Sequence, residues 1–230
     1  MCGRFASTTP PDKLASYFGA ISPSVDTAVG SNDASDYNVA PTRDVPAVRV
    51  REDARQLDYL RWGLVPRWAK DLRIGSKMIN ARAETVATKN SFRSAFAKRR
   101  CIVAADGFYE WKRIDPKTKQ PMYIHRADGD PLAFAGLYER WTDAENLREI
   151  HTCTILTTTP NSMMEQIHDR MPVLLPPGNW DEWLDPTNTN TDSLQRLLVP
   201  APNELLTTYA VSTDVNNVRN NEASLLEPVS

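Results

Sequence analysis

Segments rich in β-branched and aromatic residues recur along most of the chain, and the helix-like segments between them are short. The strand candidates are VPAVRV (45–50), LDYLRWG (57–63), CIVAADGFYEW (101–111), PMYIHR (121–126), LAFAGLYERW (132–141), IHTCTILTTT (150–159), MPVLL (171–175) and LTTYAVS (206–212). The sequence therefore predicts an α+β fold built around antiparallel β-sheets, with a barrel-like or sandwich core and short flanking helices.

The other segments predict short helices, a hairpin and loops. Helices are expected in TTPPDKLASYFG (8–19), NSFRSAFAKR (90–99) and NWDEWL (179–184), a hairpin turn in REDARQ (51–56), and polar loops over 21–36 and 185–192. In the first helix Thr9 is the expected cap, and the two prolines after it suit the first turn.

Length and composition favour one intracellular domain over residues 1–230. A chain of 230 residues without repeats or a linker can bury a large core. Its three cysteines lack zinc-type spacing, which predicts free thiols, a reducing compartment and no metal. Without a secretory leader or a long apolar run, the chain is expected in the cytoplasm and not in a membrane. A net charge of −2 predicts that any nucleic-acid site is local.

The chain begins MCGRFA, with a cysteine directly behind the initiator methionine. If Met1 is removed, Cys2 carries an α-amine and a thiol on adjacent carbons. Free groups of these kinds titrate near ~8 and ~8.5, so each has a reactive fraction at neutral pH. The simpler alternative is an unstructured chain start in which the cysteine has no role.

Polar side chains also stand where the strand pattern favours apolar ones. In MINARAET (78–85), Asn80 and Arg82 alternate with apolar residues, so both project from one side of an extended segment. Glu110 lies between Tyr109 and Trp111, where a desolvated carboxylate suits general acid catalysis. The structural alternative for Glu110 is a surface ion pair with a neighbouring basic side chain, Arg82 or Lys112.

In IHDRMP, His168, Asp169 and Arg170 stand together just before a strand candidate. Trp62 and Trp68 bracket GLVPR, which is expected to be a surface turn. This pair could stack unpaired bases while the arginines at positions 4, 82 and 170 reach phosphates. Ordinary core packing is the alternative for the histidine and the tryptophans, and the basic run KRR (98–100) is expected to be a solvated helix end.

Several motifs resemble, in order, those of the SRAP (SOS response-associated peptidase) family. They are MCGRFA, YNVAPT (37–42), WGLVPRW (62–68), INARAET (79–85), ADGFYEWK (105–112), IHDRMPVLL (167–175) and VNNVRNNEASLLEPV (215–229), which together span nearly the whole chain. The resemblance implies action on abasic sites in single-stranded DNA. It also implies that Met1 is removed, by the protein itself or otherwise, and that the exposed cysteine joins covalently to the lesion.

Carried onto this sequence, the resemblance implies that Cys2 is the nucleophile and that Asn80, Glu110 and His168 are the other catalytic residues. The residues implied at the DNA are Arg4, Asn38, Pro41, Trp68, Arg82, Trp111 and Arg170. Neither a cofactor nor a metal is implied, and a monomer is expected. Two departures affect loop contacts only: Arg67 stands where many relatives have a small residue, and residues 185–198 match no motif.

The residue types suit the implied reaction, because an aminothiol can trap an aldehyde as a five-membered thiazolidine. A plain imine would instead invite strand cleavage by β-elimination, a lyase reaction. Three alternatives remain open. MCG also begins N-terminal-nucleophile amidohydrolases, Cys2 with His168 could form a peptidase, and the chain could bind single-stranded DNA with Cys2 idle.

Overall fold

The computed structural model describes residues 2–22, 35–145 and 147–229. The strands are β1 Phe5–Ser7, β2 Asp36–Val39, β3 Asp44–Arg51, β4 Ala54–Trp62, β5 Asn80–Arg82, β6 Arg100–Ala105, β7 Gly107–Arg113, β8 Lys119–Arg126, β9 Leu132–Thr142, β10 Glu149–Thr158, β11 Met171–Pro172 and β12 Leu206–Ala210. The α-helices are α1 Pro11–Phe18, α2 Arg93–Lys98, α3 Ser162–Glu165, α4 Trp180–Leu184 and α5 Thr191–Arg196. Short 3-10 turns are η2 Leu72–Lys77, η3 Ala83–Thr85, η4 Pro177–Asn179, η5 Asn203–Leu205, η6 Thr213–Asn216 and η7 Ala223–Leu226.

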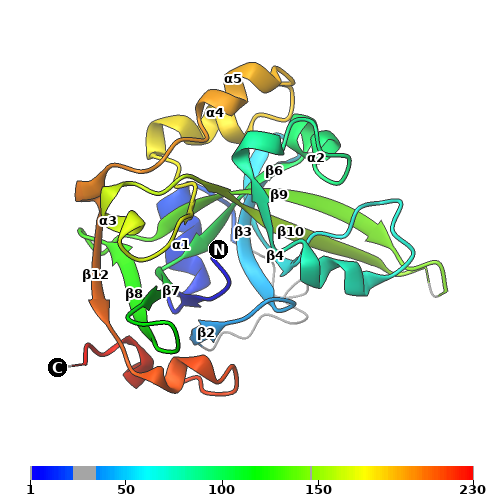
Figure 1. Ribbon diagram of the computed structural model, residues 1–230. Helices are drawn as coiled ribbons and strands as arrows, with labels where there is room; N and C mark the ends of the chain where they lie inside the picture. The colour runs from blue at the N-terminus through cyan, green and yellow to red at the C-terminus, as the bar shows by residue number, and fades with distance from the viewer. Residues whose placement is uncertain (1, 23–34, 146, 230) are drawn as a thin grey trace.

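Two sheets organise these elements (Figure 1). One has the order β12-β8-β7-β1-β2, and the other has the order β11-β10-β4-β3-β6-β9, with β5 added beside β10. Because β9 also pairs with β10, the strands β3, β4, β10, β9 and β6 close into a ring. The predicted α+β class with a barrel-like antiparallel core is confirmed. The pairings of β10 with β4 and β5 are the parallel exceptions.

Both faces of β6 are buried along its whole length, which explains its apolar run. Along β6, Ile102 and Ala104 pack in a cluster with residues of α2, α4 and α5, whereas Cys101 and Val103 pack in a second cluster that contains Cys2. The three helices lie together at the top of Figure 1, and β12 with the C-terminal segment lies at the lower left. Across the described residues, no helix combines the length and apolar character that crossing a membrane requires.

The predicted strand 101–111 is wrong as a single element, because it divides at Asp106 into β6 of the ring and β7 of the other sheet. The Asp106 carboxylate accepts hydrogen bonds from the backbone N–H and the hydroxyl of both Thr8 and Thr9. The predicted capping role of Thr9 is also wrong. Its hydroxyl is used by Asp106, and α1 begins after Pro10 without a side-chain cap.

The basic run 98–100 is a solvated helix end only in part: Lys98 is exposed at the end of α2, whereas Arg100 is buried. Its guanidinium donates to the carbonyl oxygens of Phe96, Trp183, Asp185 and Asn188. These carbonyls lie at the end of α2 and around α4, where helix carbonyls lack intrahelical partners. Arg100 therefore fastens the helical layer to the ring.

The other local predictions mostly agree with the structure. β3 and β4 form the expected hairpin, with Glu52 and Asp53 at φ angles of 51° and 60° in the turn. The strand expected at 171–175 is reduced to β11, followed by a single bridge between Leu174 and Phe134. Most of the loop expected at 21–36 lies outside the described residues, and Asp36 already belongs to β2.

Candidate active site

The pairing of β1 with β7 determines where Cys2 lies, because Cys2 precedes β1 in the chain. Phe5 lies opposite Phe108, and the Tyr109 N–H donates to the Arg4 carbonyl at 3.0 Å. The backbone before β1 therefore continues along β7 toward Glu110. Cys2 itself is fully buried in the apolar cluster inside the ring.

Asn80 begins the short strand β5, where it lies opposite Ile155 of β10. Its Nδ2 donates to the backbone carbonyl of Cys2 at 2.8 Å. Among the described residues, its Oδ1 is buried without a hydrogen-bond partner, so an acceptor remains available beside Cys2. The alternation predicted for 78–85 holds, because Ala81 is buried while Arg82 is exposed.

Glu110 lies in β7 opposite Met122 and is only 2% exposed. Its Oε2 is 4.0 Å from Nε2 of His168. The alternative of a surface ion pair is therefore wrong, and a buried carboxylate faces an imidazole beside Cys2.

His168 follows α3 and is held by the backbone, its N–H donating to the Met164 carbonyl at 2.8 Å. Its Nδ1 is 3.1 Å from the Arg170 N–H and 2.8 Å from Oδ1 of Asp169. The neutral ring accepts from Arg170 through this nitrogen, whereas the doubly protonated ring donates to Asp169. Nδ1 of His168 thus has a donor and an acceptor within hydrogen-bond distance, and both help to orient the ring.

The electrostatic setting of Cys2 favours the neutral thiol. Burial is the larger cause, and the nearby Glu110 carboxylate adds to it, so the pKa of Cys2 lies well above its ordinary value. A thiol held protonated is a weak nucleophile until a base removes its proton.

Arg4 and Asn38 form a second polar group beside the site. Arg4 donates to Oδ1 of Asn38 at 2.6 Å and to the Val215 carbonyl at 2.8 Å, and its guanidinium lies 5.8 Å from the Trp111 ring centroid. Asn38 is 1% exposed, and its Nδ2 donates to carbonyls of the C-terminal segment at Val215, Asn217 and Asn220. Asn38 thus lies beneath Arg4, where it supports the guanidinium.

The remaining residues expected at the DNA differ in exposure. Trp68 is 56% exposed, Arg82 is exposed and Pro41 is partly buried. The expected surface turn at GLVPR is wrong, because Trp62, Leu64, Val65 and Pro66 are buried. The indole N–H of Trp62 donates to the Ile79 carbonyl at 2.9 Å, so Trp62 cannot stack on a base.

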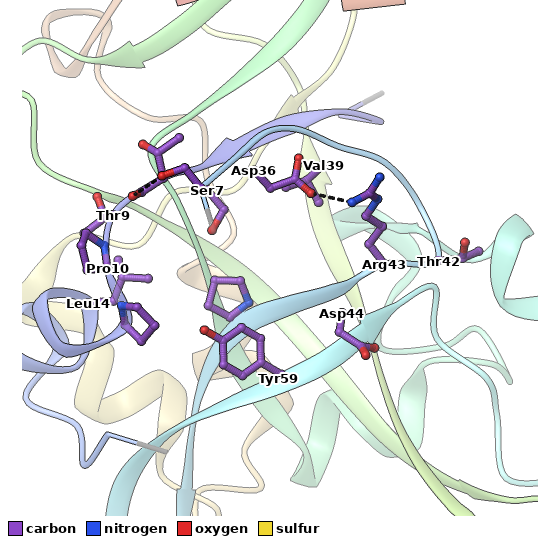
Figure 2. A pocket seen from close by; sticks show the side chains of 14 residues that line it. Ser7, Thr9, Pro10, Leu14, Asp36, Val39, Thr42, Arg43, Asp44 and Tyr59 are labelled. Atoms are coloured by element: carbon purple, nitrogen blue, oxygen red, sulfur yellow. Dashed lines mark hydrogen bonds and ion pairs between the residues drawn. The ribbon is translucent and has the colours of Figure 1, made fainter. Parts of the chain in front are cut away.

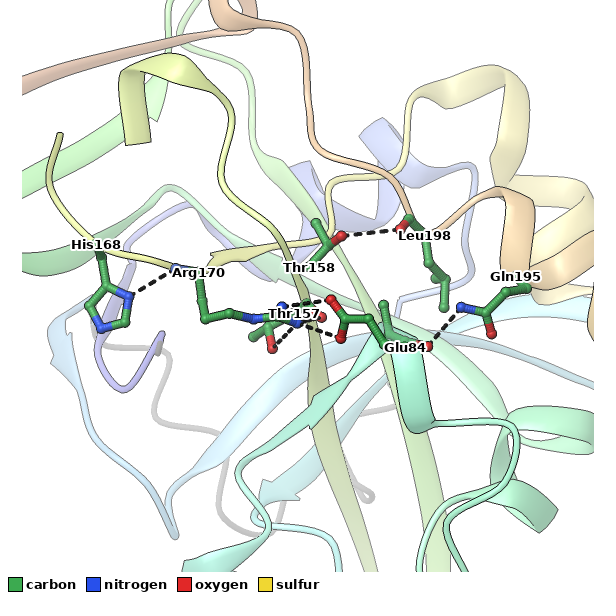
Figure 3. A network of polar contacts seen from close by, with 8 residues as sticks. Glu84, Thr157, Thr158, His168, Arg170, Gln195 and Leu198 are labelled. Carbon is green, nitrogen blue, oxygen red and sulfur yellow. Dashed lines mark hydrogen bonds and ion pairs between the residues drawn. The ribbon is translucent and has the colours of Figure 1, made fainter. Parts of the chain in front are cut away.

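Arg170 is tied into the protein by its side chain (Figure 3). Its guanidinium makes two hydrogen bonds to the Glu84 carboxylate, at 2.6 and 2.9 Å, and one to the Thr157 carbonyl at 2.6 Å. Sequence reasoning missed Glu84 as a site residue. Its position in INARAET, two residues after Arg82, was the available signal.

A cavity of about 300 Å³ opens between the start of α1, β2 and β3 (Figure 2). Asp36 and Arg43 form an ion pair of 3.1 Å at its wall, and Cys2, Asn80, Glu110 and His168 are not among the residues that line it. Within the described ranges, no three His, Cys, Asp or Glu side chains gather closely enough to hold a metal ion.

Comparison with known proteins identifies relatives along the whole chain. The abasic site processing protein YoqW of Bacillus subtilis (strain 168) is 47% identical over 228 residues, 99% of each chain. YedK of Escherichia coli (strain K12) is 35% identical across all of both chains, and HMCES of Xenopus tropicalis is 33% identical over 96% of this chain and 76% of that protein. Both also carry the name abasic site processing protein.

The fold has relatives among solved structures as well. A crystal structure of a protein from Bacteroides thetaiotaomicron matches the whole of both chains with a TM-score of 0.89 at 27% identity. The family model described as SOS response associated peptidase (SRAP) matches residues 1–218. The chain therefore belongs to the SRAP family, with Cys2, Asn80, Glu110 and His168 gathered where β1, β5 and β7 approach one another.

Proposed function

We propose that this chain senses and shields abasic sites in single-stranded DNA by forming a covalent thiazolidine through Cys2, exposed when Met1 is removed. The names of its relatives support action on abasic sites. The observation that carries the proposal is the hydrogen bond from Asn80 to the Cys2 carbonyl, which holds the future N-terminus beside Glu110 and His168. The chain would act as one domain over 1–230, as a monomer in the cytoplasm.

The reaction begins with the ring-opened aldehyde of the abasic sugar. The lone pair of the Cys2 amine forms a C–N bond to the aldehyde carbon, and loss of water leaves an imine. The sulfur then forms a C–S bond to the imine carbon, and the thiol proton ends on nitrogen. The product contains protein plus DNA less one water, and no oxidant or reductant is needed.

The surroundings of Cys2 support attack by the amine first. Because burial and Glu110 raise the pKa of the thiol, sulfur is held protonated until the imine forms. Closing a five-membered ring afterwards is an intramolecular step, which benefits from proximity. The buried cluster around Cys2 also limits hydrolysis of the imine.

Each neighbouring side chain has a proposed role in proton transfer or orientation. Glu110 would move protons during ring opening and loss of water. His168 would hydrogen-bond the sugar hydroxyl released on ring opening. The buried Oδ1 of Asn80 would accept a hydrogen bond from the freed Cys2 amine, since among the described residues it has no other partner.

Contacts to DNA are proposed from the side chains around this cluster. Arg4, Arg82 and Arg170 would meet phosphates, and Pro41, Trp68 and Trp111 would line the path of the bases. Asn38 would act by holding Arg4, because its own polar groups are used within the protein. Such binding would be indifferent to sequence, since a lesion without a base presents no base edge.

Intact-protein mass spectrometry tests the proposal. The protein is incubated with a single-stranded oligonucleotide carrying one abasic site, beside an undamaged oligonucleotide and a Cys2→Ala variant. We expect an adduct of protein plus DNA less one water, stable without borohydride, and absent from both controls. The unreacted peak reports whether Met1 is present. Failure of protein with an exposed Cys2 to react would overturn the proposal, and ammonia release from glutamine would then favour an amidohydrolase.

A further inference from the structure

Glu84 and Arg170 form a two-pronged ion pair at the edge of the candidate site (Figure 3). The Arg170 guanidinium donates to both carboxylate oxygens of Glu84, at 2.6 and 2.9 Å, and also to the Thr157 carbonyl. Paired planar groups of this kind fix geometry more strictly than a single contact. The side chain of Arg170 is 12% exposed and that of Glu84 is 47% exposed, so solvent screens the charge attraction in part and the pair acts mainly through its geometry.

The pair connects to His168 through the backbone of Arg170. The Arg170 N–H donates to Nδ1 of His168 at 3.1 Å. Arg170, whose side chain is bound by Glu84, therefore also orients the imidazole through its backbone. The Asp169 carboxylate, 2.8 Å from the same nitrogen, can accept only when Nδ1 is protonated. When Nδ1 accepts from Arg170, the proton of the neutral ring resides on Nε2, which faces Glu110 at 4.0 Å.

Glu84 also belongs to the same segment as Asn80. β5 spans Asn80–Arg82 and runs directly into η3, which carries Glu84. Gln195 of α5 donates to the carbonyl of Ala83 at 2.7 Å and steadies this turn from the other side. One short segment thus holds Cys2 through Asn80 and His168 through Glu84 and Arg170.

The same pairing limits what Arg170 offers to DNA. Two of its nitrogens are occupied by Glu84 and Thr157, and its Nε is buried without a partner among the described residues. A carboxylate in direct contact also offsets its positive charge. The phosphate contact proposed for Arg170 is therefore weaker than that of an unpaired arginine, and the pair has a positioning role beside it.

We infer that Glu84 is a positioning residue, which acts through Arg170 to orient His168 and sets the rate of cross-linking rather than the affinity for DNA. The inference rests on the proposed function. A misplaced catalytic group costs about 10- to 100-fold in rate, and we expect that loss in Glu84→Gln at saturating DNA. Affinity for a strand carrying an aldehyde-free abasic analogue should stay within about twofold of wild type.

A coupling experiment separates positioning from general structural damage. In a His168→Ala background, Glu84→Gln should cause no further loss of rate, because the group that it orients is gone. Asp128→Asn is the matched control, since Asp128 makes a two-pronged pair with Arg126 on β8. This control should cross-link at the wild-type rate. An additive loss in the double variant, or equal rates for Glu84→Gln and Asp128→Asn, would overturn the inference.

A spectroscopic measurement tests the same idea without cross-linking. The chain has three histidines, so ¹⁵N-histidine labelling gives a simple spectrum. Glu84→Gln should shift the Nδ1 resonance of His168 while those of His125 and His151 stay in place. An unchanged His168 resonance would overturn the inference even if the wild type cross-links. If the wild type forms no adduct but the resonance moves, the proposed function fails and the structural coupling stands.

Discussion

The side-chain amide of Asn80 lies 2.8 Å from the carbonyl oxygen of Cys2 and joins the two sheets of the molecule. Asn80 belongs to β5, beside β10 of the ring, whereas Cys2 leads into β1 of the other sheet. The position of the reactive cysteine is therefore set by tertiary structure, although it lies at the start of the chain.

Replacing Asn80 with alanine should slow cross-linking about fivefold, because a lost hydrogen bond is worth about 1 kcal/mol and the Cys2 backbone loses its anchor. The measurement is the time course of the shifted band on a denaturing gel. Asn188→Ala, in the loop between α4 and α5, is the control and should match wild type. An Asn80→Ala protein that reacts at full rate would remove this residue from the mechanism.

Replacing Glu110 with glutamine should lower the cross-linking rate by about 10²- to 10⁴-fold, the usual contribution of a general acid–base group. Glutamine keeps the size of the side chain, so folding should be retained and thermal unfolding can verify this. Glu182→Gln, on the exposed surface of α4, provides the comparison. Wild-type kinetics in Glu110→Gln would show that proton transfer does not pass through this carboxylate.

Non-covalent binding to single-stranded DNA should depend only moderately on salt. Full contacts from Arg4 and Arg82 and a weaker one from Arg170, which is paired with Glu84, predict a log–log slope between about −1.4 and −2, from about 0.7 per phosphate on single strands. Arg82→Gln should make the slope shallower by about 0.7. Fluorescence anisotropy with the aldehyde-free analogue measures both values. A much steeper slope would reveal a basic surface beyond these arginines.

His151 should make folding less favourable in mild acid. Burial, and next the Arg49 guanidinium that donates to its Nδ1 at 2.7 Å, lower the pKa of His151 in the folded state. The unfolded chain then binds more protons, so the contribution to stability is full above about pH 6.5 and is lost as pH falls through the folded-state pKa.

Urea unfolding at pH 7 and pH 5 measures this effect. The wild type should lose more unfolding free energy over this interval than His151→Gln, which keeps a hydrogen-bonding side chain without a titrating group. Equal losses in the two proteins would assign the acid sensitivity elsewhere.

Arg100→Met should destabilise the fold by about 2–4 kcal/mol, because buried carbonyl oxygens around α2 and α4 lose their donor. Lys98→Met changes an exposed basic residue two positions earlier and should change stability little. Urea midpoints compare the two variants. A mild effect in Arg100→Met would mean that water replaces the guanidinium.

Sequence reasoning located the strands and the clustered polar residues better than it located boundaries between sheets. The apolar run through 101–111 predicts extended structure, but alternation cannot show that its two halves join different sheets. The division depends on Asp106, whose partners lie about a hundred residues earlier in the chain. Long-range hydrogen bonds of this kind leave no local pattern.

In the candidate site, too, long-range contacts could not be predicted from the local sequence. Motifs singled out Cys2, Asn80, Glu110 and His168, and the structure gathers them. Asn38 and Trp62 were expected at the DNA or at the surface, yet both are buried, because their polar atoms find carbonyl partners elsewhere in the fold. Burial of a polar residue depends on such distant partners, which a residue pattern does not specify.

The passage from β6 to β7 at Asp106 has a thermodynamic consequence. At this point a single residue, Asp106, connects the ring to the second sheet, and its hydrogen bonds to Thr8 and Thr9 hold the end of β1 beside it. The separation between β5 and β7 is therefore fixed when the chain folds. The conformational entropy of bringing Cys2, Asn80 and Glu110 together is lost when the chain folds. The site is therefore preorganised, and binding of an abasic site does not have to supply free energy to assemble it.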